Sequence, residues 1–322
     1  MSQVNAELGI SPVTTQISLN QASVRTLFGK SSGAISMSDG WGKSNYGNTV
    51  AYSAAGEWEW TVPSGVTSIW VKMWGAGGSA GAQGAGGAGG YMEGYLAVSA
   101  GNKIRLWVAD YRGTDGDNAC ECYDDGNQDL PVRWPNNTGF GGQASFASSS
   151  FGNYMIVGGG GGGSEGAGGA GGGTTGVTGA TGTNSGGNGG GQAAGGSGQQ
   201  NGSYHSTTGY MPGTGGDSRN AVACTSCGNG TSCGAGGGGG GDGWGGGGLG
   251  YTSENGCDYP HGGGGGGGSS NYSGGSWSSV VNSQGSGTTP PETGNSNYAS
   301  GVAVGASAGF YSGGPGRVVI RY

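Results

Sequence analysis

Alternation of apolar and polar residues begins soon after residue 50. Residues 57–62 (EWEWTV) place both tryptophans and the valine on one face. Residues 66–74 (VTSIWVKMW) repeat the alternation after Pro63, Ser64 and Gly65, which are typical turn residues. A period of two indicates strands that bury one face. The pattern therefore predicts two neighbouring strands joined by a short turn.

Further strand patterns lie toward both ends of the chain. Shorter apolar runs predict strands at 91–98, 104–109, 144–146, 154–157 and 302–304. The last residues, 317–322 (RVVIRY), form an apolar strand whose natural neighbours are the early strands. We therefore predict a mainly β protein. An antiparallel β-sandwich at 46–157 is completed by 300–322, and 158–299 form a large glycine-rich insertion.

The first 45 residues contain the pattern of one short helix. Val24, Leu27 and Phe28 have the spacing i, i+3, i+4, and Gly29 follows as a stop signal. Together with Leu19 they supply too little apolar surface for an independent core. We therefore predict that residues 1–45 are a docking segment, which attaches to another protein through the side chains of Leu19, Val24, Leu27 and Phe28.

Glycine accounts for 88 of the 322 residues and gathers in near-pure tracts. The longest are Gly158–Gly163, Gly236–Gly241, Gly245–Gly248 and Gly262–Gly268. Such tracts form either a flexible linker or extended threefold helices that pack through backbone hydrogen bonds. Aromatic residues and cysteines interrupt them, which would be an aggregation hazard in a mobile segment. We therefore predict order, as packed extended or polyglycine-type helices.

Charge and hydropathy exclude several classes of function. Charged residues make up 9% of the chain, the formal net charge is −7, and no cluster of Lys and Arg is present, which argues against nucleic-acid binding. No apolar run approaches the roughly 18 residues of a membrane span. The N-terminus (MSQVNAELGISPV) lacks the basic and apolar regions of a secretory signal. We expect synthesis in the cytoplasm without a signal peptide.

The cysteines favour covalent cross-links. They occur as Cys120-x-Cys122, Cys224-x-x-Cys227, Cys233 and Cys257. A C-x-x-C pair also suits zinc or an iron–sulfur cluster, but a second close knuckle is missing, because one residue alone separates Cys120 from Cys122. We expect disulfide bonds, within the chain or to a partner chain, in preference to a metal site. A chain without a signal but with disulfides fits a particle that is assembled in a cell and released by lysis.

An acidic stretch offers a weaker metal motif. Aspartates alternate around glycine at Asp115, Asp117, Asp124, Asp125 and Asp129. Calcium loops have this arrangement, but the glutamate that completes such a loop is missing, so a solvated acidic loop is favoured over calcium. The chain has two histidines, and no nucleophile motif such as G-x-S-x-G surrounds a plausible nucleophilic serine. We therefore expect no enzymatic activity and no cofactor.

Large aromatic residues interrupt the glycine tracts. They are Trp244, Tyr251, Tyr259, Tyr272 and Trp277. Aromatic faces stack on sugars and anchor interfaces, which makes these residues candidates for contact with a receptor. The alternative is that they cap the ends of the packed glycine tracts. The sequence leaves both interpretations open.

Two parts of the sequence resemble known proteins. Residues 17–44 (ISLNQASVRTLFGKSSGAISMSDGWGKS) resemble the N-terminal segment of tail-fibre and minor tail proteins of tailed bacteriophages, notably those of cyanobacteria. Residues 60–78 (WTVPSGVTSIWVKMWGAGG) and 313–322 (GGPGRVVIRY) resemble the start and end of the glycine-rich domain that many such proteins carry. In one adhesin group of this kind, the glycine tracts pack as a lattice of polyglycine helices. This chain differs from that group in its N-terminal segment and its cysteines.

The resemblance implies a structural virion protein of the tail, with a trimer as the favoured oligomer. Its N-terminus would bind baseplate proteins, in one possibility through a disulfide, and its distal part would contact a glycan or protein of the host surface. One alternative is a purely structural minor tail or baseplate protein without receptor binding. Another is a free glycine-rich protein that binds a surface such as ice.

Overall fold

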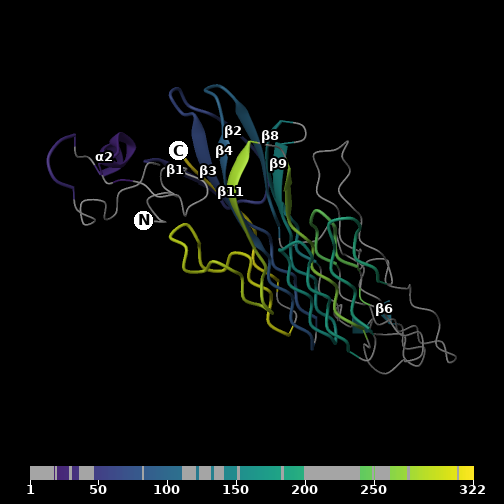
Figure 1. Cartoon of the computed structure of the whole chain (residues 1–322). Helices are drawn as coiled ribbons and strands as arrows, with labels where there is room; N and C mark the ends of the chain where they lie inside the picture. The colour runs from purple at the N-terminus through teal and green to yellow at the C-terminus, as the bar shows by residue number, and fades with distance from the viewer. Residues whose placement is uncertain are drawn as a thin grey trace.

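A computed structural model describes most of the chain. The described residues are 18, 20–28, 31–35, 47–81, 83–110, 121–122, 132–133, 141–150, 153–182, 185–198, 240–248, 250, 262–273, 276–309 and 312–322. Figure 1 shows a β-sandwich from one end of which a bundle of extended tracts continues. The fold is mainly β, with α2 (Ala22–Phe28) as the one α-helix among the described residues.

Two antiparallel five-stranded sheets make up the sandwich, as predicted. Sheet A has the order β1 (Thr49–Tyr52), β12 (Arg317–Arg321), β3 (Ser68–Trp74), β4 (Tyr91–Ala97) and β11 (Trp277–Ser283). Sheet B has the order β10 (Asn271–Ser273), β9 (Asn153–Val157), β8 (Ser145–Ser150), β5 (Lys103–Val108) and β2 (Gly56–Thr61). A separate small ladder joins β6 (Glu121–Cys122) to β7 (Val132–Arg133).

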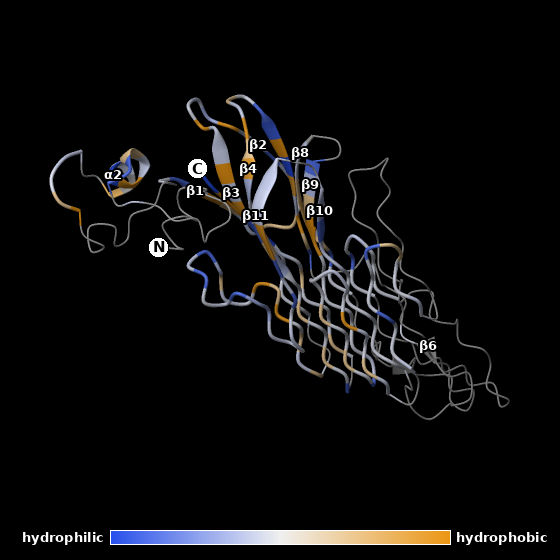
Figure 2. Cartoon of the chain, in the orientation of Figure 1, coloured by the Kyte–Doolittle hydropathy of each residue, from blue (hydrophilic) through white to orange (hydrophobic). Residues whose placement is uncertain are grey.

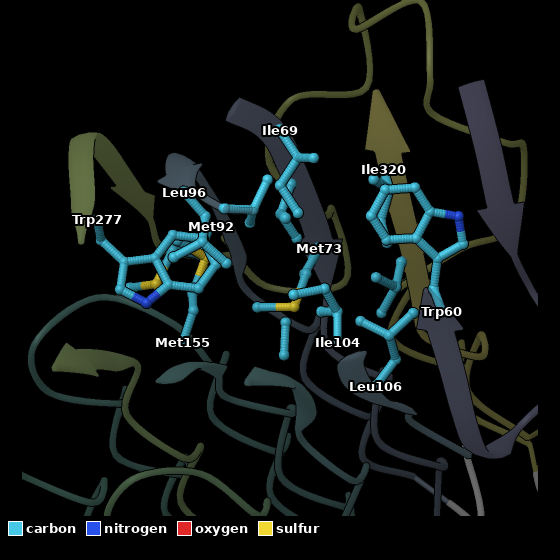
Figure 3. Close-up of a cluster of buried hydrophobic side chains, with 14 of the residues drawn as sticks. Trp60, Ile69, Met73, Met92, Leu96, Ile104, Leu106, Met155, Trp277 and Ile320 are labelled. Atoms are coloured by element: carbon cyan, nitrogen blue, oxygen red, sulfur yellow. The ribbon is translucent and has the colours of Figure 1, made fainter. Parts of the chain in front are cut away.

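The hydrophobic core lies between the two sheets. In β3 the alternation places Ile69, Val71 and Met73 on the inner face, all fully buried. On β12, Val318 and Ile320 stand opposite Met73 and Val71 and continue the same face. The C-terminal strand therefore completes the sandwich beside the early strands, as the sequence predicts. Figure 3 shows these side chains meeting those of sheet B, such as Ile104 and Leu106.

The boundary of the glycine-rich insertion differs from the prediction of 158–299. Both β10 and β11 fall inside that range, yet each is an edge strand of the sandwich. The sequence hides them because β10 (NYS) and β11 (WSSVVNS) are short or polar and carry few inward-facing apolar residues. The predicted strand at 302–304 is also wrong: residues 301–303 form a turn in which Ala303 has a φ of 59°.

Strongly apolar residues are concentrated in the sandwich, whereas the bundle of tracts is mostly of intermediate hydropathy, with scattered apolar and polar positions (Figure 2). Burial of apolar surface therefore stabilises one part of the molecule far more than the other. The bundle must be held by other interactions.

A core truncation tests the sandwich. Ile320→Ala removes a fully buried side chain from β12 and should lower the free energy of unfolding by about 2–5 kcal/mol. Val281→Ala, at a position that is 41% exposed on β11, should change it by less than about 0.5 kcal/mol. Chemical denaturation measures both values, and equal effects would contradict this placement of the core.

Candidate functional site

The bundle is a packed array of extended tracts, here called the glycine lattice. Its described tracts are 75–81, 83–90, 141–144, 158–164, 166–172, 176–182, 185–191, 240–244, 245–248, 262–270, 303–309 and 312–316. Hydrogen bonds between backbone groups of different tracts connect them throughout. The lattice therefore draws on segments from both sides of the predicted insertion as well as from within it.

Two of the pure glycine tracts, Gly158–Gly163 and Gly262–Gly268, lie at the centre of the lattice. Gly158–Gly163 is in contact through hydrogen bonds or close packing with 75–81, 84–90, 141–143, 166–172, 240–242 and 262–268. Gly262–Gly268 is surrounded in the same way by 158–163, 166–172, 176–182, 185–191, 240–242 and 246–250. A tract with neighbours on every side has no direction in which a side chain could point. This explains why these two tracts contain nothing but glycine.

Distances show how tightly the tracts approach. A Cβ atom built on Gly160 would lie 1.9 Å from the carbonyl oxygen of Gly87, and one on Gly161 would lie 2.2 Å from that of Gly265. Both obstacles are backbone atoms, which cannot rotate away as a flexible side chain can. Tracts with fewer neighbours carry small side chains three residues apart, such as Ala167 with Ala170. A spacing of three is the period of a threefold extended helix, and the described tracts are packed extended segments, as predicted; 199–239 and 251–261 lie outside the described residues.

Buried serines join the lattice to the sandwich. The Ser145 hydroxyl donates to the carbonyl oxygen of Trp74 (2.7 Å) and accepts from the backbone N–H of Ala109 (3.2 Å). The Ser270 hydroxyl accepts from the N–H of Gly158 (3.0 Å), and that of Ser269 accepts from Gly245 (3.0 Å). Where a strand ladder ends, backbone N–H and C=O groups lose their partners on the neighbouring strand. The serine hydroxyls hydrogen-bond to these groups instead. Sequence analysis missed these serines, although Ser269 and Ser270 directly follow the longest glycine tract.

Trp244 caps the lattice on the outer face of sheet B. Its ring stacks on Tyr154 with the centroids 5.3 Å apart, and its Nε1–H donates to the carbonyl oxygen of Gln192 (3.0 Å). Phe146 and Ile156 belong to the same buried cluster. Trp244 is 6% exposed, so its side chain is not available to a receptor. Of the two interpretations that the sequence left open, capping applies to this residue.

The other aromatic candidates have different surroundings. Trp277 is 7% exposed and belongs to the sandwich core on β11, so neither of the two interpretations applies to it. Tyr272, on the edge strand β10, is 45% exposed and remains a candidate for contact with a partner. Tyr251 and Tyr259 lie outside the described residues.

Turns of the lattice gather at its far end, the end away from the sandwich. Gly84 donates from its N–H to the carbonyl oxygen of Ser164, and Gly309 donates to Gly81 (3.1 Å). Glu165, in the turn after the first pure glycine tract, donates to the carbonyl oxygen of Gly262 (3.1 Å). Turns that are far apart in sequence are therefore side by side. The far end is a surface built from turns, which the tracts behind it hold in place.

The N-terminal docking candidates are only partly described. Helix α2 forms where the spacing predicts it, but Val24 is fully buried and Phe28 is 3% exposed. Both side chains are buried within this chain, and their docking to a tail protein stays a prediction. The exposed positions of the helix are Ala22, Ser23 and Thr26. Leu19 and the side chain of Leu27 lie outside the described part.

Most of the predicted cross-linking and metal residues also lie outside the described part. These are Cys120, Cys224, Cys227, Cys233, Cys257, Asp115, Asp117, Asp124, Asp125 and Asp129. Cys122 is described by its backbone alone, which pairs with Val132. Within the described ranges, no group of His, Cys, Asp and Glu is placed to hold a metal ion. None of the helices in those ranges has the length and apolar character needed to cross a membrane.

Comparison with known proteins found no relative of this chain. No family model matches the chain, and none of the curated proteins matches it. The sequence and the geometry of the sandwich and lattice therefore carry the functional argument.

A single methyl group tests the close packing of the lattice. Gly160→Ala directs a Cβ into the backbone of Gly87 and should force the central tracts apart, at a cost of about 1–3 kcal/mol or more. Gly294→Ala is the matched control, because its Cβ would meet nothing within 4 Å. Thermal unfolding should separate the two variants, and faster amide exchange in Gly158–Gly163 should accompany the first. Equal melting temperatures would contradict the packing.

Reduction tests the predicted disulfide bonds. The lattice buries little apolar surface, so covalent closure of the chain around it, worth about 2–4 kcal/mol for each loop, should raise stability. Strong reductant should therefore lower the melting temperature of the purified chain. An unchanged melting curve, together with six free thiols by titration under non-reducing conditions, would refute disulfide formation.

Proposed function

We propose that this chain is a tail fibre or adhesin of a tailed bacteriophage. Its N-terminal segment attaches it to the tail baseplate, and the far end of the glycine lattice contacts the host cell surface. The observation that carries the proposal is that the chain enters the sandwich at the end opposite the lattice. The resemblance of residues 17–44 to tail-protein segments supports the same assignment.

The register of sheet A defines this polarity. Strand β12 leaves the lattice at Gly316 and begins with Arg317 opposite Trp74, the last residue of β3 before the lattice. It ends with Arg321 opposite Thr49, the first residue of β1. Asn48 and Tyr322 exchange two backbone hydrogen bonds beyond that point. The N-terminal segment therefore joins the sandwich at one end while the lattice leaves from the other, so the two ends can serve different partners.

A backbone-bonded lattice suits the presentation of a binding surface. Its tracts have fixed neighbours, whereas the turns at the far end are not constrained by packing on every side. Turns and loops on a rigid scaffold tolerate sequence change and often carry recognition. A host-binding protein needs this combination, because the receptor can change while attachment to the particle must not. The partner at this end would be a glycan or a protein of the host surface.

The proposal places the chain in the virion tail and assigns it binding chemistry, not catalysis. Trimers are the favoured assembly for a fibre of this kind, and a disulfide to a baseplate partner is one means of attachment. A purely structural tail protein without receptor binding is the competing function.

Two variants of the chain, introduced into the phage, separate attachment from recognition. Deletion of residues 1–45 should give particles that lack the chain. Replacement of residues 251–261 by a glycine–serine segment of equal length should leave the chain in the particle but lower adsorption to host cells at least tenfold. Immunoblots of purified particles and adsorption rates measure the two effects.

Each variant is the control for the other. Particles that retain the shortened chain would refute attachment through the N-terminus. Normal adsorption by the second variant, and by similar replacements in the described far-end turns, would favour the purely structural role.

A further inference from the structure

A buried polar cluster lies on the outer face of sheet A. Lys72 on β3 and Glu93 on β4 are directly opposite in the ladder. The Lys72 Nζ lies 3.6 Å from Glu93 Oε2, and the two side chains are 5% and 19% exposed. Asn295 reaches the same point from residues 284–302, here called the covering segment, and its Oδ1 is 3.2 Å from Lys72 Nζ. Figure 1 shows this segment as a yellow loop beside the sandwich.

Aromatic rings enclose the cluster. The Lys72 Nζ stands 3.7 Å from the centroid of the Trp70 ring. Trp74 packs against Tyr91 at 4.7 Å and against Tyr298 of the covering segment at 5.9 Å. These rings pack around an amine that contacts both a carboxylate and a carboxamide. Burial of a charged pair in such surroundings is costly.

The orientation of the Asn295 amide is fixed by its partners. Its Oδ1 accepts from Lys72 Nζ and from the backbone N–H of Asn297 (3.0 Å), which are both donors. Its Nδ2 donates to the Tyr91 hydroxyl (3.3 Å), which in turn donates to Glu93 Oε2 (2.5 Å). An ion pair followed by two hydrogen bonds therefore connects the amine through the carboxylate and the phenol to the amide nitrogen.

We propose that Lys72 and Asn295 join in an intramolecular isopeptide bond, formed without any other protein and with Glu93 as the general base and acid. The nucleophile, the electrophile and the proton carrier are all in place, and no oxidant, cofactor or further reactant is needed. This inference is independent of the proposed function.

Each step of the reaction has a group that performs it. Glu93 takes a proton from the Lys72 ammonium, and the neutral amine attacks Cγ of Asn295. Negative charge develops on Oδ1, where the N–H of Asn297 stabilises it. Glu93 passes this first proton through the Tyr91 hydroxyl to Nδ2 and then takes a second proton from the attacking nitrogen, after which the Cγ–Nδ2 bond breaks and ammonia leaves. Ammonia takes up the second proton as ammonium, so Glu93 ends as a carboxylate and both protons and charge are conserved.

Tyr91 is suited to its part in this path. Burial, with a further contribution from the neighbouring Glu93 carboxylate, raises the pKa of Tyr91 far above its ordinary value. The hydroxyl therefore keeps its proton and can accept from one side while it donates to the other. The bond that results would fasten the covering segment to β3, just before the chain enters lattice tract 303–309.

Mass spectrometry of the full-length chain tests the bond. After folding, reduction and denaturation, the intact mass should fall below the sequence mass by about 17 Da, the mass of one ammonia. Proteolysis should yield one linked species that contains the peptides of Lys72 and Asn295. Glu93→Gln, Lys72→Arg and Asn295→Ala should each restore the full mass, and Tyr91→Phe should slow the loss at least tenfold.

An exposed ion pair of the same chain provides the matched control. Lys103 Nζ and Glu59 Oε1 are 2.6 Å apart, but the side chains are 64% and 46% exposed and lie on the outer face of sheet B. Glu59→Gln should therefore leave the ammonia loss and the linked peptide unchanged. If a variant of the cluster fails to fold, the wild-type peptide map still decides the question.

Two results would overturn the inference. One is a folded wild-type chain that keeps its full mass after prolonged incubation. The other is an ammonia loss without a linked peptide, which indicates a succinimide at an asparagine. A linked peptide that forms equally fast in Glu93→Gln would remove Glu93 from the mechanism.

Discussion

Close approach of backbones without side chains is the constraint on which the whole molecule depends. In the centre of the lattice, carbonyl oxygens occupy the space where a Cβ would stand, about 2 Å from the Cβ positions of Gly160 and Gly161. Only at such distances can each tract reach neighbours on all sides with its own N–H and C=O groups. Glycine loses more backbone entropy on folding than any other residue, so this arrangement holds only if the backbone groups are paired almost throughout.

The sandwich supplies the hydrophobic core that the lattice lacks. Its core buries large apolar side chains from both sheets, including Ile69, Met92 and Leu106. The strands then continue directly into the tracts, as β3 does beyond Trp74 and β9 beyond Val157. The register of the strands therefore fixes the position at which each tract begins along the bundle axis. Buried serines such as Ser145 complete the hydrogen bonding where strand and tract meet. Hydrophobic burial in one part thus aligns a part that has almost none.

The covering segment connects the two parts by a different route. It lies on sheet A, where Tyr298 packs near Trp74 and Trp74 donates to the carbonyl oxygen of Pro291 (3.2 Å). It then passes through a turn at Ala303 into an outer lattice tract. A pulling force on the far end of the lattice would be transmitted through the covering segment to sheet A. A covalent bond at Lys72 would resist such a force where packing alone would yield.

Local pattern determined most of the sandwich strands, because alternation in EWEWTV and VTSIWVKMW reports which face is buried, but it did not reveal β10 and β11. It also favoured order in the glycine tracts, since aromatic residues and cysteines interrupt them. Tertiary structure decided everything that depends on long-range neighbours: that 158–163 and 262–268 are central, that Trp244 is a cap and Trp277 a core residue, and that Asn295 meets Lys72. Local sequence patterns do not report a contact between residues that are more than two hundred positions apart. Such a contact exists only once the sheet and the segment that covers it have folded together.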